Sequence, residues 1–204
     1  MYVQYGCGMS PANEWRNFDA SPTLRFERIP IIGKLYTKNA NRFPENVEYG
    51  DIVKGLPVPD ESCKGIYCSH VLEHLSLEDI RTALRSTYRI LMPGGTFRLV
   101  MPDLAEMVTA YQNSTKHDAA IKFIRDTGMG HEKRICGIRG FSKLWLGNSS
   151  HLWLWDYDSI SRELDDIGFT GIRRAQFGDS LDSMFSKAEK ADRWCGCLGV
   201  ECKK

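Results

Sequence analysis

The sequence has no long apolar run and no excess of charge of either sign. None of its hydrophobic stretches approaches the ~20 residues that a membrane-spanning helix needs, and 27 basic residues are balanced by 26 acidic ones, for a formal net charge of +1. Nucleic acid and anionic membrane surfaces are bound mainly through clustered positive charge. The first residues also lack the basic and apolar regions of a secretory signal. We therefore expect a cytoplasmic protein with no nucleic acid partner and no membrane partner.

The sequence also lacks the features of a disulfide-stapled or repetitive protein. Its seven cysteines are an odd number and are scattered along 204 residues, of which 42% are hydrophobic. A chain of this size buries a core without staples, so we expect reduced thiols. It contains no internal repeat and no low-complexity tract, and its length fits one domain.

What the sequence does contain is a regular alternation of short apolar runs with helical patterns. This alternation predicts βα units and a mainly parallel sheet. Helices are predicted after Ser10-Pro11, from Ser76 to a stop at Pro93-Gly94-Gly95, after Asp103 with Glu106, over 118–126, and from an Asp158 cap to Gly168. Strands are predicted at residues 2–5, 15–18, 47–49, 65–69, 96–101, 169–177 and 197–202.

The first strand runs into Gly6-Cys7-Gly8. A glycine turn at this point brings bare backbone up to a ligand at the carboxyl edge of a parallel sheet. In a dinucleotide fold a third glycine lets a helix terminus meet a pyrophosphate, but here that position is Pro11. A ligand without phosphates fits better, and an ordinary tight turn remains an alternative.

Acidic residues end the second and third predicted strands. Asp19 follows the second strand, where a carboxylate can accept hydrogen bonds from both hydroxyls of a ribose. Asp51 follows the third strand, where a carboxylate can accept from the exocyclic amine of an adenine. For each, a solvated loop aspartate is the alternative interpretation.

Four segments in order, with a matching tail, resemble the methyltransferase type 11 group of class I S-adenosylmethionine-dependent enzymes. The segments cover nearly the whole chain and are Tyr5–Gly8 with Asn17–Asp19, Gly50-Asp51 with Leu56–Asp60, Ser69–Leu75, Leu91–Asp103, and a tail with His151, Ile167–Phe169 and Glu201–Lys204. The short stretch between Gly8 and Asp19 and the missing third glycine depart from the family pattern.

The resemblance implies a fold, a cofactor and a set of contacts. The implied fold is α/β and Rossmann-like, with a seven-stranded, mostly parallel sheet, helices on both faces, and a single domain over 1–204 with an acceptor-side insertion at about 104–157. The implied cofactor is S-adenosyl-L-methionine, with the ribose held by Asp19, the adenine facing Asp51, and Ser69 and His70 beside the methyl group. The residues expected to bind it are Gly6, Cys7, Gly8, Asp19, Asp51, Ile52, Ser69 and His70.

The acceptor side is expected to involve histidines and a basic, aromatic segment. His74, His151 and His70 are the candidate catalytic residues, with His74 and His151 orienting or deprotonating the acceptor. Gly128–Trp155 is the candidate lid, and a solvated face beside buried tryptophans is its alternative. The basic and aromatic residues in it are Lys133, Arg134, Arg139, Phe141, Lys143, Trp145, Trp153 and Trp155.

Two patterns invite a metal-site interpretation. His70-Val71-Leu72-Glu73-His74 matches an inverted zinc-protease motif, which needs both histidines on one continuous helix, whereas a strand leads straight into His70. The terminal Cys195, Cys197 and Cys202 lack the spacing and the fourth ligand of a zinc knuckle. We therefore expect no metal.

The favoured function is thus methyl transfer to a small-molecule or glycan-type acceptor. A nicotinamide oxidoreductase is less favoured because Pro11 replaces the third glycine. A non-catalytic partner subunit with a cofactor fold is the third possibility, and the intact Gly6, Gly8, Asp19 and Asp51 argue against it.

Overall fold

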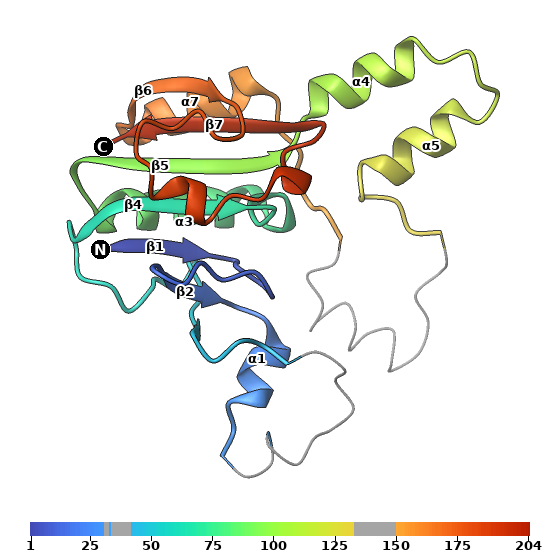
Figure 1. Ribbon diagram of the computed structural model, residues 1–204. Coiled ribbons are helices and arrows are strands. Elements are labelled where there is room, and N and C mark those ends of the chain that lie inside the picture. The colour runs from blue at the N-terminus through green and yellow to red at the C-terminus, as the bar shows by residue number, and fades with distance from the viewer. Residues whose placement is uncertain (31–32, 34–41, 133–149) are drawn as a thin grey trace.

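The computed structural model describes residues 1–30, 33, 42–132 and 150–204 and contains one seven-stranded sheet (Figure 1). The strand order is β3-β2-β1-β4-β5-β7-β6. All neighbours are parallel except β7, which runs antiparallel to both β5 and β6. The predicted mostly parallel α/β sheet is confirmed. The strands are β1 (Tyr2–Tyr5), β2 (Arg16–Asp19), β3 (Val47–Tyr49), β4 (Cys63–Ser69), β5 (Leu91–Pro102), β6 (Thr170–Ala175) and β7 (Cys197–Lys203).

The helices begin and end largely at the capping signals of the sequence. Ser76 caps α3 through the Asp79 amide, Asp103 caps α4 through the Ala105 amide, and Gly168 ends α7 with a left-handed φ of 109°. The helices are α1 (Pro22–Glu27), α3 (Leu77–Ile90), α4 (Leu104–Gln112), α5 (Ala119–Asp126) and α7 (Tyr157–Ile167), with 3-10 turns η1 (Leu72–His74), η2 (Phe185–Lys187) and η3 (Ala191–Arg193). Within the described ranges no helix is long and apolar enough to cross a membrane.

Two of the helix predictions made from the sequence are wrong, one in the position of its N-cap and one because no helix forms. The N-cap of α7 is Asp156, not Asp158, because Asp156 and Ser159 form a reciprocal capping box. The helix predicted after Ser10-Pro11 does not form. Instead the Ala12 amide donates to Gln4 Oε1 (3.2 Å) and Asn17 Oδ1 (3.1 Å). Buried side chains of β1 and β2 thus provide the hydrogen-bond acceptors that a helix would otherwise supply to this backbone amide.

The two faces of the sheet are covered by different kinds of structure. Along β4 and β5, Ile66 and Phe97 belong to the core that α3 and α7 cover, whereas Tyr67 and Val100 belong to a second core. This alternation follows from the two-residue period of a strand. The second core is closed by residues 184–194 of the β6–β7 connection, which crosses the sheet on the opposite face from α3 (Figure 1). The connection also lies against the segment where the helix after Ser10-Pro11 was predicted, since Lys190 Nζ donates to Ser10 Oγ (2.9 Å).

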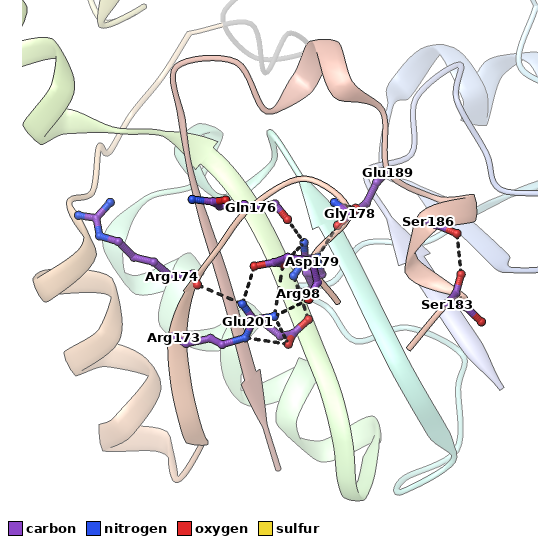
Figure 2. Close-up of polar contacts among 10 residues, drawn as sticks. All are labelled: Arg98, Arg173, Arg174, Gln176, Gly178, Asp179, Ser183, Ser186, Glu189 and Glu201. Carbon is purple, nitrogen blue, oxygen red and sulfur yellow. Dashed lines mark hydrogen bonds and ion pairs between the residues drawn. The ribbon is translucent and has the colours of Figure 1, made fainter. Parts of the chain in front are cut away.

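A buried arginine holds the β6–β7 connection to the sheet (Figure 2). Arg98 of β5 is fully buried and forms ion pairs with Glu189, Glu201 (2.9 Å) and Asp179 (2.9 Å). Its guanidinium also lies 4.6 Å from the centroid of the Trp194 ring. Because Glu189 and Trp194 belong to the connection and Glu201 to β7, one cation joins three parts of the chain. A charge is tolerated in this interior because several partners compensate it.

The Asp179 carboxylate of this network gives a prediction about how stability depends on pH. Burial by itself would raise the pKa of Asp179, but hydrogen bonds from Arg173 and Arg98 outweigh it and lower the pKa to about 2. A carboxyl whose pKa is lower in the folded than in the unfolded state stabilises the fold above about pH 4, and this contribution is lost as the pH falls toward about 2. Asp179→Asn should therefore lower the free energy of unfolding by about 1–2 kcal/mol at pH 6.

Urea denaturation at a series of pH values measures this contribution. The curves of wild type and Asp179→Asn should converge near pH 2, whereas Asp192→Asn, at an exposed position, should match wild type throughout. A difference between wild type and Asp179→Asn that stays constant from pH 6 to pH 2 contradicts the assignment.

Candidate functional site

The loops that follow β1, β2, β3 and β4 meet at the carboxyl edge of the sheet. In Figure 1 this is the edge toward which β1 and β2 point and beyond which α4 and α5 project. A cavity lies at the ends of β1 and β4, and its lining includes Gln4, Gly6, Ser10, Ser69, Lys190 and Arg193. In open parallel sheets, ligands bind at this edge.

The two glycines of the first loop have different surroundings. Both have positive φ, 65° at Gly6 and 54° at Gly8. A Cβ at Gly6 would lie 2.0 Å from Val71 Cγ2, so Gly6 permits close packing against the segment after β4. A Cβ at Gly8 would meet no atom within 4 Å. Gly8, rather than Gly6, presents bare backbone to open space.

Asp19 organises this loop while keeping capacity for a ligand. Its Oδ2 accepts a hydrogen bond from the Gly8 amide (2.9 Å) and its Oδ1 accepts one from the Ser21 amide (2.8 Å). Each carboxylate oxygen can accept a second hydrogen bond, and Asp19 is half-buried rather than enclosed. The geometry therefore leaves one acceptor position on each oxygen, the number that two ribose hydroxyls require.

Cys7 contributes to the loop as a packing residue. Its amide donates to the Phe18 carbonyl (3.2 Å) and its carbonyl accepts from the Ser10 amide (2.9 Å). Burial raises the pKa of its thiol to about 12, and the side chain packs against Leu24 and Val47. Its polar groups are thus engaged within the chain.

Asp51 and Ile52 follow β3, as the sequence predicts. Asp51 Oδ1 accepts from the Val53 amide (3.0 Å), and Oδ2 pairs with the exposed Lys54 (3.0 Å). The Ile52 side chain is buried in the main core. Of these two residues, only Asp51 has a polar side chain at the edge of the sheet that could contact a ligand.

Arg193 is a site residue that the sequence analysis missed. Its Nε donates to Ser69 Oγ (3.0 Å) and its Nη2 to the Ser69 carbonyl (3.0 Å). Lys190, on the same connection, donates to Ser10 Oγ (2.9 Å). No motif surrounds these residues, and only the unusual course of the β6–β7 connection brings their positive charge to the cavity.

His70 is held in a strained conformation by partners on both ring nitrogens. Its φ is 54°, Nδ1 lies 3.1 Å from Glu73 Oε1, and Nε2 lies 3.0 Å from the Arg193 carbonyl oxygen. Contacts with Cys197 and with Glu73 raise the pKa of His70 to about 10. An imidazole that donates from both nitrogens is a positioning group rather than a proton acceptor.

The rings of His74 and His151 lie in direct contact. Their ring centroids are 4.9 Å apart with an interplanar angle of 70°. The Leu152 amide donates to the Glu73 carbonyl (2.7 Å) and the His151 amide to the Gly128 carbonyl (3.1 Å), which fixes His151 between η1 and the end of α5. A Cβ at Gly128 would lie 2.6 Å from His151 Nδ1, so this close approach needs glycine.

The candidate lid is described only at its two ends. Gly128–Glu132 and Ser150–Trp155 are described, and the rings of Trp153 and Trp155 lie 6.1 Å apart. The helices α4 and α5 have no buried residue, which suits elements placed over an edge of the sheet. The other basic and aromatic residues of the lid, Lys133, Arg134, Arg139, Phe141, Lys143 and Trp145, lie outside the described residues.

Comparisons with known proteins agree with this architecture. A family model described as a methyltransferase domain matches residues 23–99. That stretch includes Asp51, η1 and most of β5 and begins after Asp19. No curated protein matches the chain.

Several solved structures share the fold. An S-adenosylmethionine-dependent methyltransferase from Thermotoga maritima, described as a possible histamine N-methyltransferase, is 14% identical over 100% of this chain and 81% of its own, with a TM-score of 0.54. A methyltransferase of the same cofactor from Mesorhizobium loti is 17% identical over 100% and 90%, with a TM-score of 0.52. PigF, solved with S-adenosylhomocysteine, is 16% identical over 100% of this chain and 50% of its own, with a TM-score of 0.51.

The strand order with its antiparallel β7 is that of the class I fold. The open backbone at Gly8 and the free acceptor positions of Asp19 suit a nucleoside cofactor without phosphates. The chain thus has the class I fold, and its residues 23–99 are similar to a methyltransferase domain.

Proposed function

We propose that this enzyme methylates a small-molecule or glycan-type acceptor, with the cofactor on the β1–β2 side of the carboxyl edge and the acceptor facing His74 and His151. The observation that carries the proposal is the arrangement of the two groups of residues. Gly6, Ser69 and Arg193 line the cavity at the ends of β1 and β4, and Asp19 at the end of β2 holds the Gly8 amide. The two imidazoles belong to η1 and to the segment that leads to α7, and their rings are in contact. The described residues 1–30, 33, 42–132 and 150–204 contain no added nucleic-acid-binding module, which favours a small acceptor.

The cofactor contacts are assigned by chemistry. Asp19 accepts from the ribose hydroxyls while it holds the Gly8 amide, Asp51 lies toward the adenine, and Gly8 allows the ligand to approach the backbone closely. Arg193 and Lys190 are the cations that line the cavity, so we assign them to the carboxylate of the methionine part. Ser69 and His70 support this wall by holding Arg193 in place.

S-adenosylmethionine supplies a methyl group that its sulfonium has already activated, so the chain's residues mainly align an in-line displacement. With the cofactor bound, the acceptor hydroxyl or amine would receive the methyl group and would give up a proton to a nearby base. The Nε2 atoms of His74 and His151 are the groups placed to take that proton, since each Nδ1 faces a carbonyl.

The cofactor assignment is tested by calorimetry with S-adenosylhomocysteine. Asp19→Ala removes a charged acceptor that contributes about 1.5–3 kcal/mol, so affinity should fall roughly ten- to a hundredfold. Glu48→Ala is the matched control, because Glu48 lies beside this position in β3 and pairs with Arg16 at the surface. It should leave affinity unchanged. An unchanged dissociation constant for folded Asp19→Ala overturns the ribose assignment, and no binding to wild type overturns the cofactor site.

A further inference from the structure

Three potential metal ligands converge at the acceptor side of the site. One ligand atom from each of Glu73, His74 and His151 lies within 4.8 Å of the other two. Glu73 is buried, whereas both histidines are partly exposed, so the cluster is reachable from solvent. The cluster forms because η1 carries Glu73 and His74, and the chain after Ser150 returns along η1 through two hydrogen bonds to the Glu73 carbonyl.

The hydrogen bonds of the two histidines fix their tautomers. His74 Nδ1 lies 3.1 Å from the Ser150 carbonyl oxygen, and His151 Nδ1 lies 2.7 Å from the Thr127 carbonyl oxygen. A carbonyl oxygen only accepts, so each Nδ1 carries the proton and donates it. In neutral imidazoles each Nε2 then has a free lone pair. Backbone carbonyls that orient the ring in this way are typical of metal-binding histidines.

Glu73 supplies an independent observation. Its side chain is 1% exposed, yet Oε2 has no hydrogen-bond partner among the described residues, while Oε1 is taken by His70. A buried, unsatisfied carboxylate oxygen is costly unless a donor or a cation approaches it. A buried carboxylate oxygen without a partner therefore lies beside two imidazoles, and this group of three residues lacks a positive ligand.

We propose that Glu73, His74 and His151 bind one divalent transition-metal cation of the Zn²⁺, Co²⁺ or Fe²⁺ class. Two imidazoles and one carboxylate are the donor set of open sites for these ions. Metal–ligand bonds of about 2.0–2.2 Å require the three ligand atoms to close in by about 1 Å from their present separations. Three protein ligands leave coordination positions for an oxygen-containing acceptor. With the metal bound, this role would replace direct proton transfer to the histidine Nε2 atoms; it rests on the proposed function, whereas the binding site itself does not.

The proposed site differs from the inverted zinc-protease motif. That motif requires His70 and His74 on one helix, whereas the structure has only the short turn η1 there. His70 is not a ligand in the proposed site, because both its nitrogens have other partners. The third ligand is His151, which comes from a distant part of the chain and which spacing alone does not reveal.

The test is titration of untagged, chelator-treated protein with Co²⁺, followed by visible absorption and by competition with Zn²⁺. Wild type should bind one Co²⁺ per chain, and Zn²⁺ should displace it. His151→Ala and Glu73→Gln should each weaken binding by more than about tenfold. His117→Ala, at an exposed histidine, is the matched control and should bind like wild type. Circular dichroism verifies that each variant is folded, and His74→Ala serves if Glu73→Gln is not.

Two results would overturn the site. One is the absence of saturable Co²⁺ binding to folded wild type, which would mean that a proton shared by the imidazoles fills the cluster. The other is binding that survives His151→Ala and shows thiolate charge-transfer bands, which would place the metal on Cys195 and Cys197. S-adenosylhomocysteine binding is measured separately on the same samples. If wild type does not bind it, that result counts against the proposed function and not against the metal site.

Discussion

Replacing Arg98 with methionine should lower the free energy of unfolding by about 3–5 kcal/mol, because it leaves the carboxylates of Glu189 and Glu201 near each other without their cation. For a chain of this size the melting temperature should fall by roughly 10 °C. Differential scanning calorimetry measures both quantities. Desolvation makes such a network a weak source of net stability, but removing one member of it exposes the full cost of the others.

The matched control for Arg98→Met is the same substitution at Arg81. Arg81 pairs with Glu163 through a two-pronged contact (2.7 Å for the shorter Nη2 bond), but it lies on the surface. Arg81→Met should cost less than about 1 kcal/mol. The variant Arg98→Met with Glu189→Gln and Glu201→Gln should regain part of the loss, since the uncompensated charges are gone. Equal melting temperatures for Arg98→Met and Arg81→Met contradict the role of the buried cation.

The second large effect is expected at Gly6, and its neighbour Gly8 should behave differently. Gly6→Ala combines a positive φ with a contact of 2.0 Å to the stiff side chain of Val71, and should cost about 2–5 kcal/mol. Gly8→Ala has the same kind of φ but free space, and should cost only about 1–2 kcal/mol. Its new methyl group, however, enters the space assigned to the cofactor.

The two glycine variants therefore separate stability from binding. Urea denaturation should rank Gly6→Ala below Gly8→Ala, and calorimetry should show that Gly8→Ala loses S-adenosylhomocysteine affinity by about tenfold or more. Adding Val71→Ala to Gly6→Ala should restore the part of the stability that the clash removes. Equal stability of the two single variants, or normal affinity of Gly8→Ala, would show that the loop is arranged differently.

The sequence predicted what short-range chemistry determines. Ser76 and Gly168 mark helix ends because a cap depends on the nearest few residues, and both are confirmed. Asp19 and Asp51 were predicted at the site because carboxyl ends of neighbouring parallel strands meet at one edge, and their roles stay predictions. The same local reasoning failed at Ser10-Pro11, where a helix signal is present but the connection is satisfied by Gln4 and Asn17 instead.

The rest of the site depends on contacts between distant parts of the chain. Arg193 belongs to no motif, and its place beside Ser69 follows from the β6–β7 connection crossing the sheet. Glu73 Oε2 lacks a hydrogen-bond partner because of how the surrounding residues pack, and no sequence pattern predicts this. His74 and His151 were predicted to reach one acceptor site; the structure places their rings in contact, and their role stays a prediction.

The unusual covering of the sheet has a consequence for synthesis of the chain on the ribosome. Trp15 and Tyr67 are made early, but the residues that cover them, Phe185 and Trp194, are made last. One wall of the cavity joins Ser10 to Lys190, which are 180 residues apart. Such long-range closure is slow and leaves apolar surface exposed in the meantime. A nascent chain can pair its first strands well before release, but it acquires the cavity, and the stabilisation that a bound ligand supplies, only once the connection before β7 has emerged.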